Sequence, residues 1–160
     1  MPINEEVALQ LGNKVRVRAC GLLFEGKNLL MVNHTGLYGH DFWSPPGGGL
    51  AYGETPQEAL AREFHEECGL IIEPGEFRFT CSVRKPPLHA IELFFMVNRT
   101  GGRLQTGLDP ERGSRQIISA VEFMSPDRLD RLPPAHKHPL LSRLTGSAEI
   151  LRITGFFDLA

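Results

Sequence analysis

Three glutamates, Glu63, Glu66 and Glu67, have the types and spacing best suited to chemistry. At about 100° per residue, positions three and four apart share one face of a helix, so the three carboxylates would crowd within one turn. Repulsion within each like-charged pair costs about 0.2–0.5 kcal/mol, so stability alone disfavours this placement. Hard cations such as Mg²⁺ bind to carboxylates, water and phosphate oxygens. The spacing therefore favours a divalent-cation site, and the alternative is a solvated acidic face on which Arg62 pairs with Glu66.

A run of glycines, Gly47, Gly48 and Gly49, lies a short loop upstream of the glutamates. Because glycine has no side chain, backbone groups there can approach a metal ion or a phosphate closely. Taken alone, the run is explained as well by a Pro-Gly turn. Together with the acidic face, it predicts a site for a cation and phosphate groups.

The element that must position the glutamates is a helix over residues 56–68. Thr55 and Glu58 have the spacing of a capping box, and Pro56 suits the first helical position. Gly69 supplies the stop signal. One face of this helix is predicted to pack on a sheet or core through Leu60, Ala61, Phe64 and Cys68.

Apolar segments on both sides of this helix predict strands. We expect residues 15–24 and 29–32 to form a β-hairpin, and residues 84–89 to form a connection too long for a tight hairpin turn. The order of elements predicts an α+β protein, an α/β/α sandwich with a mixed sheet against which the helix packs. The other expected strands or short helices are 77–83, 90–97, 116–124, 125–132, 138–144 and the apolar tail 150–157.

Length and composition narrow the class of protein. The 160 residues predict one domain, 1–160, and the formal net charge of −2 gives no global basic footprint for nucleic acid or an anionic membrane. No segment approaches the ~18 apolar residues that span a bilayer, so we expect a cytoplasmic protein without a membrane or nucleic-acid partner. The three cysteines form no CxxC pair and are expected to be buried thiols: Cys20, Cys68 and Cys81.

The segment from Gly48 to Leu70 resembles the Nudix box, the signature of the Nudix hydrolase family, at every defined position. Gly48 is followed after five residues by Glu54 and after seven more by Arg62-Glu63-Phe64-His65-Glu66-Glu67-Cys68-Gly69-Leu70. The resemblance implies the family's α/β/α sandwich. It also implies hydrolysis of a nucleoside diphosphate linked to another moiety, with Mg²⁺ or Mn²⁺ as cofactor.

The resemblance also implies roles for single residues. Glu66 and Glu67 match metal ligands, Glu63 matches a ligand or the general base, and the carbonyl of Gly47 can complete the metal shell. Arg62 orients the acids, and Glu54 reinforces the site from the loop. The catalytic residues expected from the box are thus Glu63, Arg62 and Glu66.

Some family members take their general base from a loop after the box, which makes Glu111 and Glu122 further candidates. Glu122 follows a strand pattern, so it can equally be a surface strand residue.

Substrate contacts are expected from Gly48 and Gly49 and from two residues outside the box. Trp43 could stack on a base or ribose, although aromatic residues at such positions are core residues about as often. Arg84 could meet a terminal phosphate, with a solvated loop as its alternative role.

Pro86, sixteen residues beyond Leu70, resembles the position of a proline in members that cleave ADP-ribose. The preferred substrate is therefore ADP-ribose or a nucleotide sugar. One alternative is a pyrophosphohydrolase that removes unwanted nucleoside triphosphates, (d)NTPs. The other is a non-catalytic module that senses a nucleotide.

Two further segments are open to more than one interpretation. His136 and His138 could suggest a metal site, but their proline and lysine neighbours favour a solvated loop. The tail 150–157 is expected to cap the sheet or to join a dimer interface, and a homodimer is predicted from it.

Overall fold

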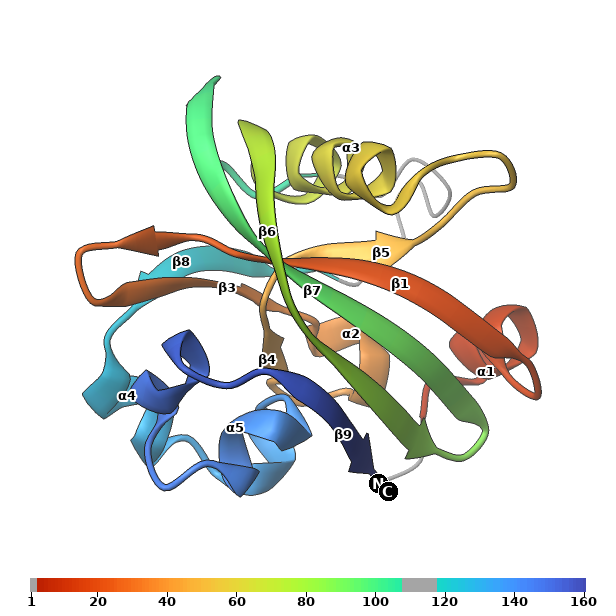
Figure 1. Ribbon diagram of the computed structural model, residues 1–160. Coiled ribbons are helices and arrows are strands. Elements are labelled where there is room, and N and C mark those ends of the chain that lie inside the picture. Colours follow the sequence, from red (N-terminus) through yellow and green to blue (C-terminus); the bar gives the residue numbers. More distant parts are fainter. Residues whose placement is uncertain (1–2, 108–117) are drawn as a thin grey trace.

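The computed structural model describes residues 3–107 and 118–160 and contains two β-sheets with helices on their outer sides (Figure 1). The larger sheet is mixed, with strand order β5-β1-β7-β6-β9. Its strands are β5 (Gly47–Gly49), β1 (Val15–Leu22), β7 (Leu88–Gly102), β6 (Leu70–Lys85) and β9 (Gly155–Leu159). The smaller sheet has the order β2-β3-β4, and β8 pairs antiparallel with β3 from Leu29–Met124 to Asn33–Ala120. Its strands are β2 (Phe24–Glu25), β3 (Asn28–Asn33), β4 (Trp43–Ser44) and β8 (Ala120–Met124).

The helices are short except for the one that carries the glutamates. The α-helices are α1 (Glu5–Leu11), α2 (Thr35–Tyr38), α3 (Pro56–Cys68), α4 (Pro126–Arg131) and α5 (Pro139–Arg143), and the 3₁₀ helices are η1 (Pro134–His136) and η2 (Ser147–Leu151). None of the helices in the described part of the chain is long and apolar enough to span a lipid bilayer.

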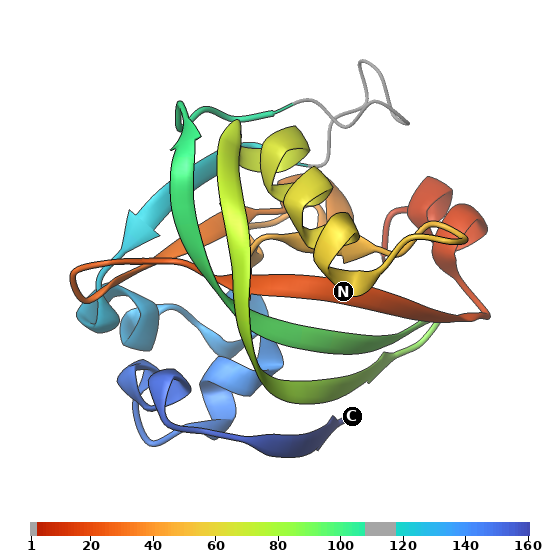
Figure 2. The ribbon, with the colours of Figure 1, turned by 45° about the horizontal axis from the view of Figure 1, so that its top comes forward.

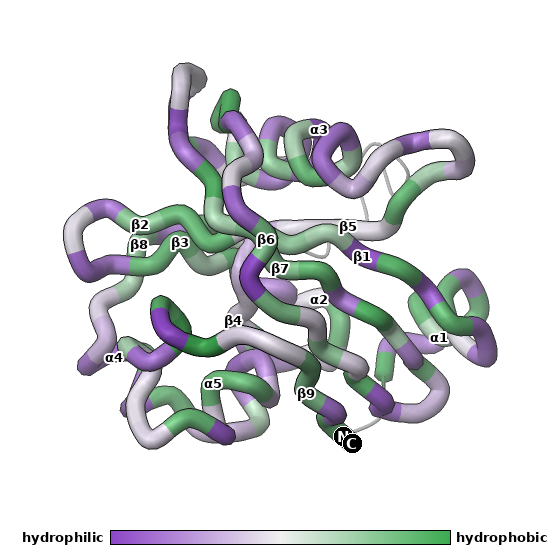
Figure 3. The backbone as a smooth tube through the Cα atoms, viewed as in Figure 1, coloured by the Kyte–Doolittle hydropathy of each residue, from purple (hydrophilic) through white to green (hydrophobic). Residues whose placement is uncertain are grey.

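Helix α3 confirms the predicted bounds and both end signals. The Thr55 hydroxyl accepts a hydrogen bond from the Glu58 backbone N–H at 3.1 Å, and the Glu58 carboxylate accepts one from the Thr55 N–H at 3.0 Å. At the other end Gly69 has φ +72°, the left-handed conformation that glycine adopts without a steric penalty. Hydrophilic and hydrophobic residues are interspersed along α3 in Figure 3, and the buried apolar residues of the helix are Ala59, Leu60, Phe64 and Cys68.

Two apolar cores lie on opposite sides of the sheets and give the sandwich. In the first, Leu60 and Phe64 of α3 pack against Ala19, Leu30 and Phe95. Figure 2 shows α3 crossing the face of the larger sheet above this core. The second core is covered by α4, α5 and η2 and includes Cys20, Met31, Phe79, Phe94, Leu129, Leu140 and Ile150. Neighbouring residues such as Leu30 and Met31 enter different cores, because side chains alternate between the two faces of a strand. The predicted α+β sandwich is confirmed.

The expected hairpin of residues 15–24 with 29–32 is wrong for most of its length. Strand β1 instead pairs in parallel with β7 and antiparallel with β5, and the hairpin is limited to β2 and the start of β3. The second half of β1 is buried on both sides. A strand buried on both faces belongs in the middle of a sheet, and there β1 has a neighbour on each side.

The expected long connection at residues 84–89 is also wrong. Strands β6 and β7 run to the end of the segment, with Arg84 paired to His89 and Lys85 to Leu88, so the turn contains Pro86 and Pro87 alone. The peptide bond between these prolines is cis. Because the strands are this long, the hairpin carries Lys85 and Leu88 to the rim of the cavity described below.

The C-terminal tail adds an edge strand to the larger sheet. Strand β9 pairs in parallel with β6, from Phe79–Gly155 to Val83–Leu159. Of the two roles expected for the tail, capping the sheet is therefore present, and the homodimer stays a prediction. The three cysteines are buried and free, as expected.

Candidate active site

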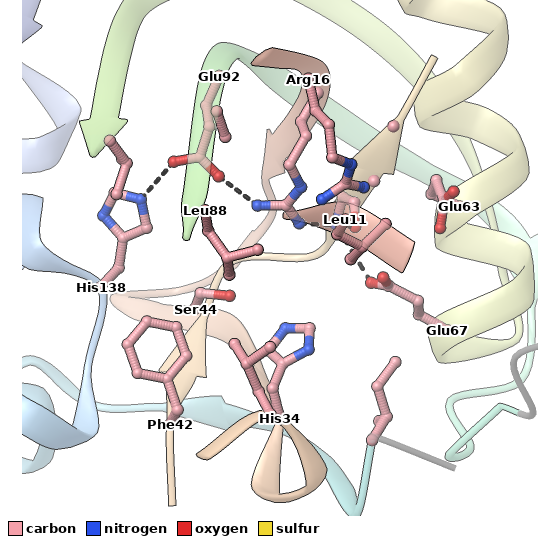
Figure 4. A pocket seen from close by; sticks show the side chains of 18 of the residues that line it. Leu11, Arg16, His34, Phe42, Ser44, Glu63, Glu67, Leu88, Glu92 and His138 are labelled. Atoms are coloured by element: carbon pink, nitrogen blue, oxygen red, sulfur yellow. Dashed lines mark hydrogen bonds and ion pairs between the residues drawn. The ribbon is translucent and has the colours of Figure 1, made fainter. Parts of the chain in front are cut away.

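The three glutamates of α3 line one cavity of about 640 Å³. Strand β5 supplies the opposite wall through Gly47, Gly48 and Gly49, and β1 adds Arg16 and Arg18. Figure 4 shows Glu63 and Glu67 extending from the helix toward Arg16, with His34, Phe42 and Leu88 farther along the cavity. The predicted partnership between the acidic face and the glycine run is therefore present in the fold.

Strand β5 contacts two of the carboxylates through its backbone. The Gly47 N–H donates to a Glu67 oxygen at 3.2 Å, and Glu67 is 8% exposed. A Cβ built on Gly48 would lie 2.2 Å from the carboxylate carbon of Glu63, so only a glycine allows this approach. Burial raises the pKa of Glu63, and Arg62 offsets this rise only in part.

Arg62 lies at the centre of the acidic cluster and orients it. Its Nε and Nη2 form a bidentate pair with Glu54, each at 2.8 Å, while Nη1 lies 2.9 Å from Glu63 and 3.3 Å from Glu66. Hydrogen bonds from Arg62 and from the Ala51 N–H hold the pKa of Glu54 at about 2, so Glu54 is ionised at neutral pH. Arg62 and Glu54 thus lie where the box motif predicts them, and one cation holds three carboxylates in place.

A buried polar network that sequence reasoning missed lies in the wall of the same cavity. Glu92 of β7 pairs with Arg18 on one side and accepts a 2.6 Å hydrogen bond from His138 Nε2 on the other. His138 Nδ1 accepts from the Leu140 N–H at 3.1 Å, so the ring proton lies on Nε2. Arg18 also donates to the Gly47 carbonyl at 3.2 Å. The network therefore reaches the carbonyl predicted as a metal ligand.

The expectation of a solvated His138 is wrong, since this residue is 5% exposed. The sequence signal that could have revealed the network is Glu92 itself, a single charge in the apolar run of residues 90–97. A buried carboxylate needs charged or hydrogen-bonding partners, and the sequence alone does not show that His138 is one of them.

His34 is a second cavity residue that the sequence did not single out. Its Nε2 is buried and has no hydrogen-bond partner within the described residues. Burial and the nearby positive charge of Arg18 lower its pKa to about 3, so the imidazole is neutral. The cavity wall here can accept or donate a hydrogen bond without adding charge.

Two residues expected to contact substrate do not line the cavity. Trp43 is 4% exposed and packs in the core under α4 and α5, because β4 turns its side chain inward while the neighbouring Phe42 faces the cavity. Arg84 points to the other side of β6 and pairs with Asp158 at 2.8 Å. Phe42 and Lys85 lie in the cavity wall instead.

The structure describes one of the two additional candidates for the general base. Glu122 lies on β8 and pairs with Arg128 at 2.5 Å, away from the cavity lining, in the surface strand role that was its alternative. Glu111 lies outside the described residues.

The glutamates share the cavity without forming a closed ligand set. Across residues 3–107 and 118–160, no three His, Cys, Asp or Glu side chains stand close enough together to hold a metal ion as they are oriented. Arg62 instead occupies oxygens of Glu63 and Glu66.

Comparison with known proteins decides the family. A family model described as "NUDIX domain" matches residues 14–143, which is most of the chain and includes α3 and β5. The chain belongs to the NUDIX domain family. The matched range includes Gly48 to Leu70, the segment that resembles the Nudix box, and the residue roles that this resemblance implies stay predictions.

Known proteins match this Nudix chain at modest identity. The "Putative ADP-ribose pyrophosphatase YjhB" of Bacillus subtilis is 28% identical over 138 residues, which cover 82% of this chain and 60% of that protein. A solved Nudix hydrolase of Nitrosomonas europaea has a TM-score of 0.69 at 19% identity, covering 81% of this chain and 85% of its own. An ADP-ribose pyrophosphatase of Streptococcus suis has a TM-score of 0.60 at 21% identity, and the match covers 89% of this chain and 98% of that one. The chain thus spans about three-fifths of the YjhB relative, and the solved structures establish the fold.

Proposed function

We propose that this Nudix protein is a divalent-metal-dependent hydrolase. It cleaves the diphosphate linkage of a nucleoside diphosphate joined to a second moiety, with ADP-ribose or a nucleotide sugar as substrate. The observation that carries the proposal is the set of three carboxylates on α3 facing the bare backbone of Gly47–Gly49 across one cavity. The Bacillus subtilis relative, whose name describes an ADP-ribose pyrophosphatase, supports the substrate class.

The residues present fit Mg²⁺ or Mn²⁺ by their donor chemistry. Glu63, Glu66, Glu67 and the Gly47 carbonyl would supply only oxygen ligands, which are the ligands that hard cations take. Glu63 and Glu67 are largely buried, so without a cation their negative charges are poorly solvated. Arg62 contacts one oxygen of Glu63 and one of Glu66 besides its bidentate contact with Glu54, so each of these two carboxylates has a second oxygen that Arg62 does not contact.

The chain's own residues bind and orient the substrate. A bound cation would neutralise charge on the diphosphate and lower the pKa of a coordinated water. Arg16 and Arg18 extend from β1 into the same cavity and supply positive charge for phosphate oxygens. If Glu66, Glu67 and the Gly47 carbonyl hold the cation, Glu63 is the cavity carboxylate left to accept the proton of the attacking water, whereas Glu122 lies elsewhere.

A turnover screen with a matched pair of variants tests the proposal. ADP-ribose, UDP-glucose and the four dNTPs are incubated with Mg²⁺ or Mn²⁺, and the products are separated by chromatography. The wild type is expected to release AMP from ADP-ribose, or UMP from UDP-glucose. Glu67→Gln is expected to lose at least about 100-fold of that activity, because several kcal/mol of charge stabilisation depends on the metal. Glu73→Gln, a change of one exposed glutamate on β6, serves as the control and keeps full activity.

Each other outcome identifies a different function. Release of pyrophosphate from a dNTP, with no cleavage of either diphosphate sugar, would replace the proposal with triphosphate hydrolysis. Tight nucleotide binding without metal-dependent turnover would indicate a sensing module.

A further inference from the structure

The end of the cavity remote from the glutamates carries a cation that is paired with none of the acidic residues in the described part of the chain. Lys85, at the end of β6, lies in the cavity wall, and its Nζ is 4.1 Å from the centre of the Tyr38 ring and 5.8 Å from that of Phe42. Within the described residues, no carboxylate oxygen lies within 4.0 Å of this ammonium group. A lysine that packs over aromatic rings in a cavity, with no counter-charge, is available to a ligand.

The neighbouring cation, Arg84, does have an acidic partner, unlike Lys85 within the described residues. Consecutive strand residues point to opposite faces, so Arg84 turns toward β9 and pairs with Asp158 while Lys85 turns into the cavity. The cavity's own acids are already engaged or remote. Glu92 is held by Arg18 and His138, and the other three carboxylates belong to α3.

The surroundings of Lys85 strengthen its attraction for an anion. Tyr38 is 8% exposed, and its ring meets Phe42 edge to face at 5.2 Å, so the wall beside the ammonium group is formed by packed aromatic rings. Partial burial lowers the pKa of Lys85. A charge that has lost part of its water interacts more strongly with an opposite charge, because the local dielectric constant is lower.

The register of the sheet sets the separation between the two ends of the cavity. On β1, Arg18 is in register with Glu92 of β7 on one side and with Gly49 of β5 on the other. Lys85 of β6 is in register with Leu88 of β7, which lies four residues before Glu92. At about 3.3 Å per residue, four residues correspond to about 13 Å along the strand. Lys85 therefore meets a part of the ligand that lies well beyond a diphosphate bound at the glutamates.

We propose that Lys85 binds an oxyanion, a phosphate or a carboxylate, on the substrate moiety beyond the diphosphate, and so selects nucleoside diphosphates with an anionic second moiety. This inference rests on the proposed function and narrows its substrate class. A neutral sugar reaches the same wall but leaves the ammonium group without a counter-charge, so it is cleaved less efficiently.

Two substrate pairs, each differing by one anionic group, test the inference. The carboxylate pair is UDP-glucose and UDP-glucuronic acid, and the phosphate pair is ADP-ribose and its derivative phosphorylated on the terminal ribose. In at least one pair, the wild type is expected to favour the anionic member about tenfold in kcat/KM, mainly through a lower KM. The pair that shows the preference identifies the source of the oxyanion. The preference is expected to shrink between 0.05 M and 0.5 M salt, since added ions screen a partly exposed charge pair.

Three variants assign that preference to Lys85. Lys85→Gln removes the charge at similar length and is expected to reduce the tenfold preference to about one, with little effect on the neutral member. Lys85→Arg keeps the charge and is expected to retain most of the preference. Lys27→Gln, in the exposed turn between β2 and β3, is the matched control and changes nothing. Thermal unfolding of each variant shows that the fold is intact.

The outcomes separate this inference from the proposed function. Equal kcat/KM within both pairs, or a preference that survives Lys85→Gln, overturns the role of Lys85 while metal-dependent cleavage stands. Equal losses on neutral and anionic members would show that Lys85 binds an uncharged oxygen, which also overturns it. If the wild type cleaves no member of either pair, the proposed function fails. Calorimetric Kd values for the same pairs then decide the Lys85 inference, and equal Kd values refute it.

Discussion

Gly48→Ala is expected to remove activity while leaving the protein folded. The added Cβ would lie 2.4 Å and 2.6 Å from the two carboxylate oxygens of Glu63, whereas ordinary van der Waals contact begins at 3.4 Å. The carboxylate must therefore move by about 1 Å. The backbone at Gly48 is outside the left-handed region, so alanine adds no backbone strain there.

The expected size of the effect follows from that displacement. A 1 Å misplacement of a reacting group can cost about 100-fold in rate, so kcat for the diphosphate substrate is expected to fall about 100-fold. The atoms that must move are the end of a side chain in a cavity, so the free energy of unfolding should change by less than about 1 kcal/mol. For a chain of this size, that corresponds to a change in Tm below about 4 °C.

Steady-state kinetics and thermal unfolding of the same preparations check this prediction. Gly101→Ala on β7 is the matched control, because its Cβ would meet Ile71 at an ordinary 3.6 Å and Gly101 does not line the cavity. It should leave both kcat and Tm unchanged. A Gly48→Ala enzyme within threefold of wild-type kcat would refute the reasoning, since the position of the Glu63 carboxylate would then not limit catalysis. A loss of activity together with a large fall in Tm would show that strand β5, rather than the carboxylate, had been disturbed.

Two further predictions concern stability. Thr55→Ala removes one half of the capping box of α3 and is expected to cost about 1 kcal/mol, lowering Tm by about 2–4 °C in a thermal scan, while Thr55→Ser should keep the wild-type Tm. Burial by itself would raise the pKa of Glu92, but His138 and Arg18 outweigh it and hold that pKa at about 2. Because this value lies below the ~4.3 of an unfolded glutamate, the stabilisation is present above about pH 4.3 and is lost as the pH falls toward 2. Urea unfolding at pH 6, 4 and 3 should show this loss, with a shallower decline for Glu92→Gln, and equal pH slopes for the two proteins would count against the role of Glu92.

The local parts of the site were predictable from the sequence because their geometry is set within a helical turn or a capping motif. The spacing of Glu63, Glu66 and Glu67 places them on one helical face whatever the helix packs against. Thr55 and Gly69 fix the ends of that helix through hydrogen bonds and φ values that involve only near neighbours. The resemblance to the Nudix box suggested roles for these residues. The match to the NUDIX domain model confirms membership in that family.

Positions that depend on strand pairing were the ones that sequence reasoning misplaced. The apolar pattern of residues 15–24 is the same for a hairpin strand and for a central strand between β5 and β7, and only the folded sheet distinguishes them. Trp43 begins β4 and Phe42 directly precedes it, and in the fold Trp43 packs in the core while Phe42 lines the cavity. Arg84 and Lys85 are adjacent cations, and the alternation of side chains along β6 sends one to Asp158 and the other to Tyr38.

The sequence by itself thus determined the acidic helix face, its glycine partner and the chemistry that they suit, because these depend on contacts along a few residues of chain. The tertiary structure alone decided which distant groups meet that face. Glu92 and His138 are 46 residues apart and become partners only when β7 and the start of α5 come together. Long-range pairing depends on the closure of the whole sheet, so no local pattern encodes which residues end up facing the cavity.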